Sequence, residues 1–152
     1  MAARYLEEFS VGQVFETEPV TLSEDDIIEF ARRYDPQVIH TDPEGAKDTY
    51  FKGLIASGHQ TIGVAFAQFI RLGLFAENSL GGPAMDEVRW TAPVRPGNAL
   101  VTTVEVLEIR ESKSRADRGI IRLQFRTRAD GLDVSSFTTT TFLRRRPTED
   151  AA

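Results

Sequence analysis

The chain has 152 residues, of which 41% are hydrophobic and 27% charged, and it contains no cysteine. This length suits one domain with its own hydrophobic core, and the lack of cysteine excludes disulfide scaffolds, thiol nucleophiles and thiolate metal sites. Lys and Arg number 18 against 23 Asp and Glu, a net charge of −5, which argues against a nucleic-acid-binding surface. With two histidines, His40 and His59, any base chemistry near neutral pH must involve one of them, and no metal site is expected.

The hydropathy pattern predicts neither a membrane span nor a secretory signal. The longest apolar stretch, residues 62–75, contains Gln68 and Arg71 and is too short to cross a bilayer. Acidic residues near the start stand where a signal peptide has its apolar core. We therefore expect a cytoplasmic protein with no membrane partner.

In chain order, the first predicted elements are one strand and two helices. Residues 13–22 have the composition of a strand. Ser23, followed by three acidic residues, predicts the N-cap of a helix that Pro36 ends. Asp42-Pro43 predicts the start of another helix, running toward residue 50. Residues 35–41 are therefore predicted to be a loop between two helices.

The second half of the chain predicts a buried helix and a sheet. Apolar residues of segment 59–75 fall on nearly every side of a helical wheel, which is typical of a buried helix. The strands that follow are predicted over residues 83–93, 98–110, 118–129 and 133–145, with turns at Arg95-Pro-Gly97 and Asp130-Gly131.

These elements predict an α+β fold: one hot-dog domain over residues 1–152, in which an antiparallel sheet wraps around the long central helix. The small, polar tail at residues 147–152 is expected to be disordered. An uncovered sheet edge favours a symmetric partner, so we expect a homodimer or a higher oligomer.

Asp35 and His40 are the first candidate catalytic residues. On a continuous helix, residues five apart lie about 140° apart around the axis. Pro36 prevents that helix, so a loop can bring both side chains to one point, where a carboxylate and an imidazole can handle a water molecule. The alternative is that Asp35 caps a turn and that His40 is a half-buried polar residue.

A second candidate element, Gly53-Leu-Ile-Ala-Ser-Gly58, directly precedes the buried helix. Gly58 has no Cβ to block a ligand, and its N–H lies at the positive end of the helix dipole. Such an N–H can bind a carbonyl oxygen that gains negative charge during a reaction.

Three motifs together resemble the MaoC-like dehydratase and (R)-specific enoyl-CoA hydratase family. Asp35-Pro-Gln-Val-Ile-His40 resembles the family's Asp-x-Asn-Pro-aliphatic-His signature and is closer still to an Asp-Pro-Gln-Pro-Phe-His form. Ile55-Ala-Ser-Gly58 is similar to its aliphatic-Ala-His/Ser-Gly segment, and Arg89-Trp-x-x-Pro-Val-Arg-Pro-Gly97 to its strand-and-turn motif. The resemblance covers residues 9–146.

The resemblance implies roles for three residues, and two neighbours of Gly58 are further candidates. Asp35 and His40 form the catalytic pair that holds water, and the Gly58 N–H binds the thioester oxygen. Ser57 and His59, which flank Gly58, are expected to contact substrate, although His59 can also be simply a polar residue at a helix entry. No cofactor is implied.

The sequence departs from the family pattern in two places. Gln37-Val38 replaces the Asn-Pro of the signature, and Phe66 stands where well-characterised hydratases carry a serine eight residues beyond the glycine. The loop therefore lacks a rigidifying proline, and a bulky Phe66 can shorten the acyl pocket.

The expected function is that of a hydro-lyase, which adds water to or removes it from an acyl-CoA or acyl-carrier-protein thioester. One alternative is a hot-dog thioesterase, which commonly carries an acid on the central helix; residues 58–76 contain none, and the first acid is Glu77. Another is a non-catalytic acyl-binding subunit, against which the retention of Asp35, His40 and Gly58 argues.

Overall fold

The protein is described by a computed structural model that covers residues 2–149. The sheet contains β1 (Val14–Glu16), β2 (Val20–Thr21), β3 (Ala84–Trp90), β4 (Ala99–Glu111), β5 (Arg118–Ala129) and β6 (Leu132–Arg144). The helices are α1 (Glu24–Tyr34), α2 (Val38–Thr41), α3 (Pro43–Ala46) and α4 (Gly58–Ile70), with short 3₁₀ turns at Leu6–Glu8 and Ala76–Asn78.

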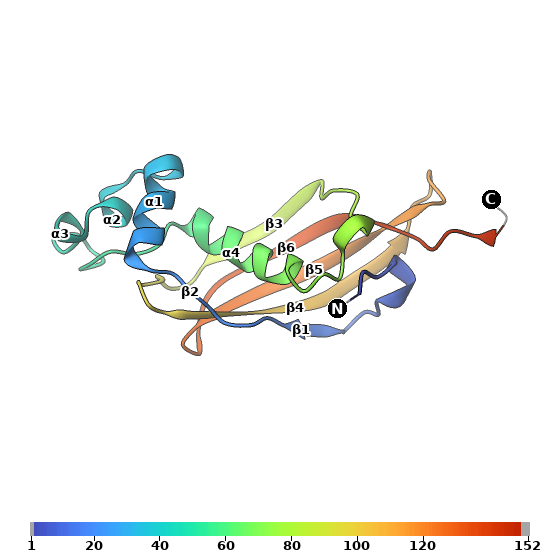
Figure 1. The fold of residues 1–152 in the computed structure, drawn as a ribbon, viewed down its shortest axis with the longest axis horizontal. Helices are drawn as coiled ribbons and strands as arrows, with labels where there is room; N and C mark the ends of the chain where they lie inside the picture. Colours follow the sequence, from blue (N-terminus) through green and yellow to red (C-terminus); the bar gives the residue numbers. More distant parts are fainter. Residues whose placement is uncertain (1, 150–152) are drawn as a thin grey trace.

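The sheet is antiparallel and curves along α4, which lies lengthwise on one of its faces (Figure 1). The strand order is β1-β4-β5-β6-β3, with β2 also pairing to β4, so β1 and β3 form the two edges. Helix α4 packs against β4, β5 and β6, whereas α1, α2 and α3 gather at one end of the sheet. This arrangement confirms the predicted α+β hot-dog fold.

The alternation of residues on β5 explains how the sheet meets the helix. Ile121, Leu123 and Phe125 are completely buried, whereas the arginine and glutamine residues between them point to the other face. Phe125 stacks on Phe137 of β6 with ring centroids 4.5 Å apart, and Phe69 of α4 meets the Phe125 ring edge-on.

Local sequence signals place α1 accurately. The Ser23 hydroxyl accepts a hydrogen bond from the Asp26 N–H at 3.0 Å, and the Asp26 carboxylate accepts one from the Ser23 N–H at 2.9 Å. The helix ends at Tyr34, before Pro36, as predicted. Asp42 caps α3, also as predicted, by accepting from the Glu44 N–H.

Four predicted segments differ from the structure. The first strand is divided between β1 and β2, because Pro19 lacks the N–H that a continuous ladder needs. The predicted loop contains the helical turn α2, and α3 ends at residue 46 instead of running toward residue 50. Helix α4 stops at Ile70 and not at residue 75, since the chain turns at Gly73 with φ of 77°.

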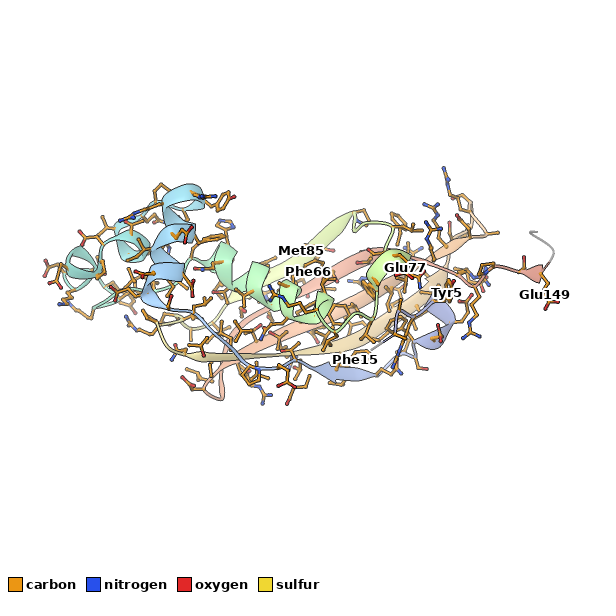
Figure 2. The ribbon with its side chains drawn as sticks, in the orientation of Figure 1. Tyr5, Phe15, Phe66, Glu77, Met85 and Glu149 are labelled. Carbon is orange, nitrogen blue, oxygen red and sulfur yellow. The ribbon has the colours of Figure 1, made fainter. Side chains whose placement is uncertain are left out.

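The apolar pattern predicted that α4 is buried on all sides, but in the structure one side of the helix is exposed. Phe66 and Ile70 are more than one third exposed, and Gly63 faces open space. Phe66 lies near Met85 of the edge strand β3 (Figure 2), and both line a small cavity of about 270 Å³. We call Phe66 and Met85 the β3 patch.

The opposite, buried side of α4 carries a polar anchor. The Gln68 side-chain amide donates to the carbonyls of Glu18 and Leu100, each at 2.9 Å. Its oxygen accepts from the Thr102 hydroxyl, which also contacts the Thr127 hydroxyl. This network fixes α4 against β4 and β5.

Past β6, residues 147–149 continue as an exposed irregular segment, and the rest of the predicted disordered tail lies outside the described residues. No helix within residues 2–149 has the length and apolarity that crossing a membrane requires.

Candidate active site

Asp35 and His40 meet at the end of the molecule where the small helices gather. Asp35 follows the last residue of α1 with φ of −157°, and Pro36 directs the chain away from the helix axis. The turn α2 then brings His40 back, with its Nε2 3.2 Å from Asp35 Oδ2. Both side chains are largely buried, at 6% and 16% exposure for His40 and Asp35.

A backbone carbonyl fixes the protonation of one nitrogen of His40. Nδ1 of His40 lies 2.7 Å from the carbonyl oxygen of Ile55. Because a carbonyl oxygen only accepts, Nδ1 must carry the proton in this contact. In the neutral ring, Nε2 therefore turns a lone pair toward Asp35. The imidazole and the carboxylate can then bind a water molecule between them and accept one proton from it.

Two further side chains hold the Asp35 carboxylate. The Gln37 amide donates to Oδ1 at 2.8 Å, and the Ser57 hydroxyl donates to Oδ2 at 2.7 Å. Burial works to raise the pKa of Asp35, but these hydrogen bonds, together with the nearby His40 and His59, outweigh it and leave the pKa below its ordinary value. Asp35 is therefore ionised at neutral pH.

Gly58 is the first residue of α4 and lines the same cavity as Asp35 and His40. Within residues 2–149 its N–H has no hydrogen-bond acceptor, as expected for the first turn of a helix. The indole of Trp90 packs against Gly58. The indole N–H donates to the Gly58 carbonyl at 3.0 Å, and a Cβ on Gly58 would lie 2.5 Å from the ring. Any larger residue at this position would therefore force the indole or the first turn of α4 to move.

The cavity has a volume of about 550 Å³. Its walls are the segment from Asp35 to His40, an aromatic turn at Tyr50 and Phe51, the first turn of α4, and the chain from Trp90 to residue 94. The Arg95 guanidinium holds the aromatic turn by donating to the Phe51 carbonyl. Apart from the polar groups of the loop and of α4, this lining is mostly apolar, which suits an uncharged organic group.

Not every predicted residue lies where the sequence suggested. His59 lines the cavity, with its ring 6.4 Å from that of Trp90. Ser57, in contrast, is completely buried and directs its hydroxyl at Asp35, so its position does not support a direct substrate contact. Phe66 does not line this cavity.

Sequence reasoning assigned no role in the site to Gln37 or Trp90. Gln37 was seen only as a departure from the signature, although its amide, two residues after Asp35, is well placed to reach that carboxylate. Trp90 stands in the sequence only as part of the strand-and-turn motif, because its approach to Gly58 joins residues 32 positions apart.

Metal ligands are scarce in this region. In the part of the chain that the structure describes, no three His, Asp or Glu side chains come together as a metal-binding group. The residues that converge are those of an acid–base site with a backbone donor.

Comparison with known proteins agrees with this geometry. Residues 8–124 match the model of the MaoC like domain. The chain belongs to the MaoC-like dehydratase family.

Individual relatives of this MaoC-like chain match most of its length. A MaoC-like dehydratase from Rhodospirillum rubrum is 34% identical with a TM-score of 0.88, over 96% of this chain and all of that one. An (R)-hydratase from Pseudomonas aeruginosa is 25% identical with a TM-score of 0.75, over 93% and 86%. The uncharacterized protein YdeM of Bacillus subtilis (strain 168) is 38% identical over 80% of this chain and 85% of its own. Membership supports hydratase or dehydratase chemistry.

Proposed function

We propose that this MaoC-like protein is a hydro-lyase that interconverts a trans-2-enoyl thioester and the (R)-3-hydroxyacyl thioester. The observation that carries the proposal is the contact between His40 Nε2 and Asp35 Oδ2, 3.2 Å apart, in a cavity that Gly58 also lines. An acid–base pair and a free backbone donor are the two components that this addition needs.

In the hydration direction, the Asp35 carboxylate accepts a proton from water while the water oxygen bonds to C3. His40, its Nδ1 proton committed to the Ile55 carbonyl, orients the water through Nε2. The π electrons move from C2=C3 toward the thioester carbonyl, whose oxygen becomes negative and accepts from the Gly58 N–H. The proton held by the pair then passes to C2, and the net change is the addition of one water molecule.

The reverse sequence removes water from the 3-hydroxyacyl thioester through the same groups. The carrier of the acyl group is proposed to be coenzyme A or an acyl carrier protein, and the mostly apolar lining of the 550 Å³ cavity favours an uncharged acyl chain. No acidic residue lies on α4, so the thioesterase alternative lacks the acid that it commonly places there.

The test is the loss of enoyl absorbance with crotonyl-CoA and with longer or branched enoyl-CoAs. Asp35→Asn and His40→Gln are each expected to lower kcat by about 10²- to 10⁴-fold, the range of acid–base catalysis. Asp42→Asn is the matched control: Asp42 is exposed outside the cavity, and asparagine caps a helix as well as aspartate does. Full activity in both Asp35→Asn and His40→Gln contradicts the mechanism, and release of free thiol indicates a thioesterase instead.

A further inference from the structure

Residues 55–58 contact both His40 and Asp35, and they include Gly58, the candidate backbone donor. The Ile55 carbonyl accepts from His40 Nδ1 at 2.7 Å, the Ser57 hydroxyl donates to Asp35 Oδ2 at 2.7 Å, and the next residue is Gly58 with its free N–H. This short stretch before α4 therefore positions the imidazole, the carboxylate and the backbone donor relative to one another.

Ser57 is the member of this stretch whose side chain makes the connection. Its hydroxyl has one proton, which it gives to Asp35, and its oxygen accepts the His59 N–H at 3.3 Å as the N-cap of α4. Ser57 is completely buried, so water does not compete for either contact. The hydroxyl thus joins the carboxylate to the helix end that carries Gly58.

Gln37 holds the same carboxylate differently. It lies two residues after Asp35 on the same loop, so its bond to Oδ1 orients the carboxylate within that loop. The bond from Ser57 spans 22 positions and fixes the loop against α4. Removing it leaves Asp35 with the Gln37 amide and His40 but without a direct hydrogen bond to the segment that carries Gly58.

We propose that Ser57 is a positioning residue, which holds Asp35 at the correct place relative to the Gly58 N–H instead of contacting substrate. The proposal rests on the hydro-lyase function for its kinetic consequences, but not for its geometry. A misplaced carboxylate weakens proton transfer in the transition state more than it weakens binding, so kcat should fall while KM changes little.

A purely structural interpretation is that Ser57 only caps α4. Losing a cap lowers the stability of the protein by a similar amount wherever the helix lies. Ser23→Ala provides the matched control, since Ser23 caps α1 by the same kind of bond but lies outside the cavity. A role limited to capping predicts that the two variants behave alike.

The decisive readout is the titration of the Asp35 carboxyl, followed by ¹³C NMR in the full chain, which requires no turnover. Besides Ser57 and Gln37, the groups that face this carboxyl are His40 on α2 and His59 on α4. In Ser57→Ala the Asp35 pKa is expected to rise, because a hydrogen bond that favours the ionised form is lost. In Ser23→Ala it should stay at the wild-type value.

The kinetic readout uses crotonyl-CoA. Ser57→Ala is expected to lower kcat by about 10- to 100-fold, the usual effect of removing a hydrogen bond to a charged group, with KM changed by less than about threefold. Ser57→Cys keeps a weaker donor in nearly the same volume, so both its kcat and its Asp35 pKa should be intermediate; it also serves if the alanine variant does not fold.

The positioning role of Ser57 and the proposed hydro-lyase function can be disproved independently of each other. An unchanged Asp35 titration in both Ser57 variants overturns the positioning role, whether or not the wild type is active. A raised Asp35 pKa in a protein that hydrates no enoyl thioester supports the positioning role and contradicts the proposed function.

Discussion

Trp90 and Gly58 illustrate how a single side chain limits what its neighbour can be. In most helix positions alanine is favoured over glycine by about 1 kcal/mol. At Gly58, however, a Cβ would lie within 2.5 Å of the Trp90 indole, so the ring or the first turn of α4 must move. The indole also donates to the Gly58 carbonyl, which makes the ring part of the wall around the candidate oxyanion donor.

Gly58→Ala is therefore expected to lower the free energy of unfolding by about 1–3 kcal/mol, the usual cost of overpacking. Urea denaturation measures this change. In a Trp90→Ala background the same substitution should cost much less, because the clashing ring is gone. Gly63→Ala, at a helical site with nothing within 4 Å of the new Cβ, should be neutral or stabilising. Equal effects at both glycines would contradict the steric argument.

Asp35 also links stability to pH. Its pKa in the folded protein lies below the ordinary value: burial acts to raise it, but the hydrogen bonds from Gln37 and Ser57 and the nearby histidines prevail. The ionised carboxyl thus stabilises the folded state above the unfolded pKa, and this contribution is lost as the pH falls through the folded pKa.

The difference in unfolding free energy between the wild type and Asp35→Asn should accordingly be largest near pH 6 and shrink below about pH 4. Urea denaturation at a series of pH values gives this difference. The control is Asp48→Asn, at an exposed carboxyl in the turn after α3, for which a much smaller change with pH is expected. A difference that does not vary with pH would show that the contacts of Asp35 do not favour its ionised form.

At the scale of elements, α4 is held by both apolar packing and the buried Gln68 network. Replacing Gln68 with leucine removes partners from the carbonyls of Glu18 and Leu100 and from the Thr102 hydroxyl, and each buried group left unpaired costs about 1–3 kcal/mol. We expect Gln68→Leu to lower the free energy of unfolding by about 2–4 kcal/mol.

Gln60→Leu is the matched comparison on the same helix, measured by the same urea denaturation. Gln60 donates once, to the Asp26 carbonyl, and its buried oxygen has no partner in the described residues, so leucine removes an unpaired polar atom as well as a bond. Its effect should be clearly smaller than that of Gln68→Leu. A loss as large at Gln60 would show that side-chain shape, and not the polar network, accounts for the cost.

Secondary-structure boundaries could be predicted from the sequence where they depend on residues close together in the chain. The N-cap at Ser23 and the end of α1 before Pro36 each depend on residues a few positions apart, and these predictions are confirmed. The contacts that arrange the candidate site are of another kind. Ser57 reaches Asp35 across 22 positions, and the sequence gives no direct signal of such a contact.

At the scale of the whole molecule, the sheet edge formed by β3 is open. In the described part of the chain β3 pairs with β6 on one side alone, and an unpaired strand edge is a template for another strand. The β3 patch lies beside it: Phe66 on α4 and Met85 on β3, which line one small cavity, are 37% and 44% exposed. We propose that a second copy of the chain covers this edge and patch in a symmetric homodimer, because a two-fold axis lets the same strand and patch complement themselves.

Light scattering on the purified full chain should therefore give the mass of two copies. Met85→Lys places a charge in the contact, where it would be buried without a partner, so the dimer should dissociate at concentrations at which the wild type remains paired. Leu132→Lys is the control, since Leu132 is even more exposed, at 63%, but lies at the start of β6, outside the β3 patch. A monomeric wild type would disprove the dimer, and a dimer that withstands Met85→Lys must be formed through another surface.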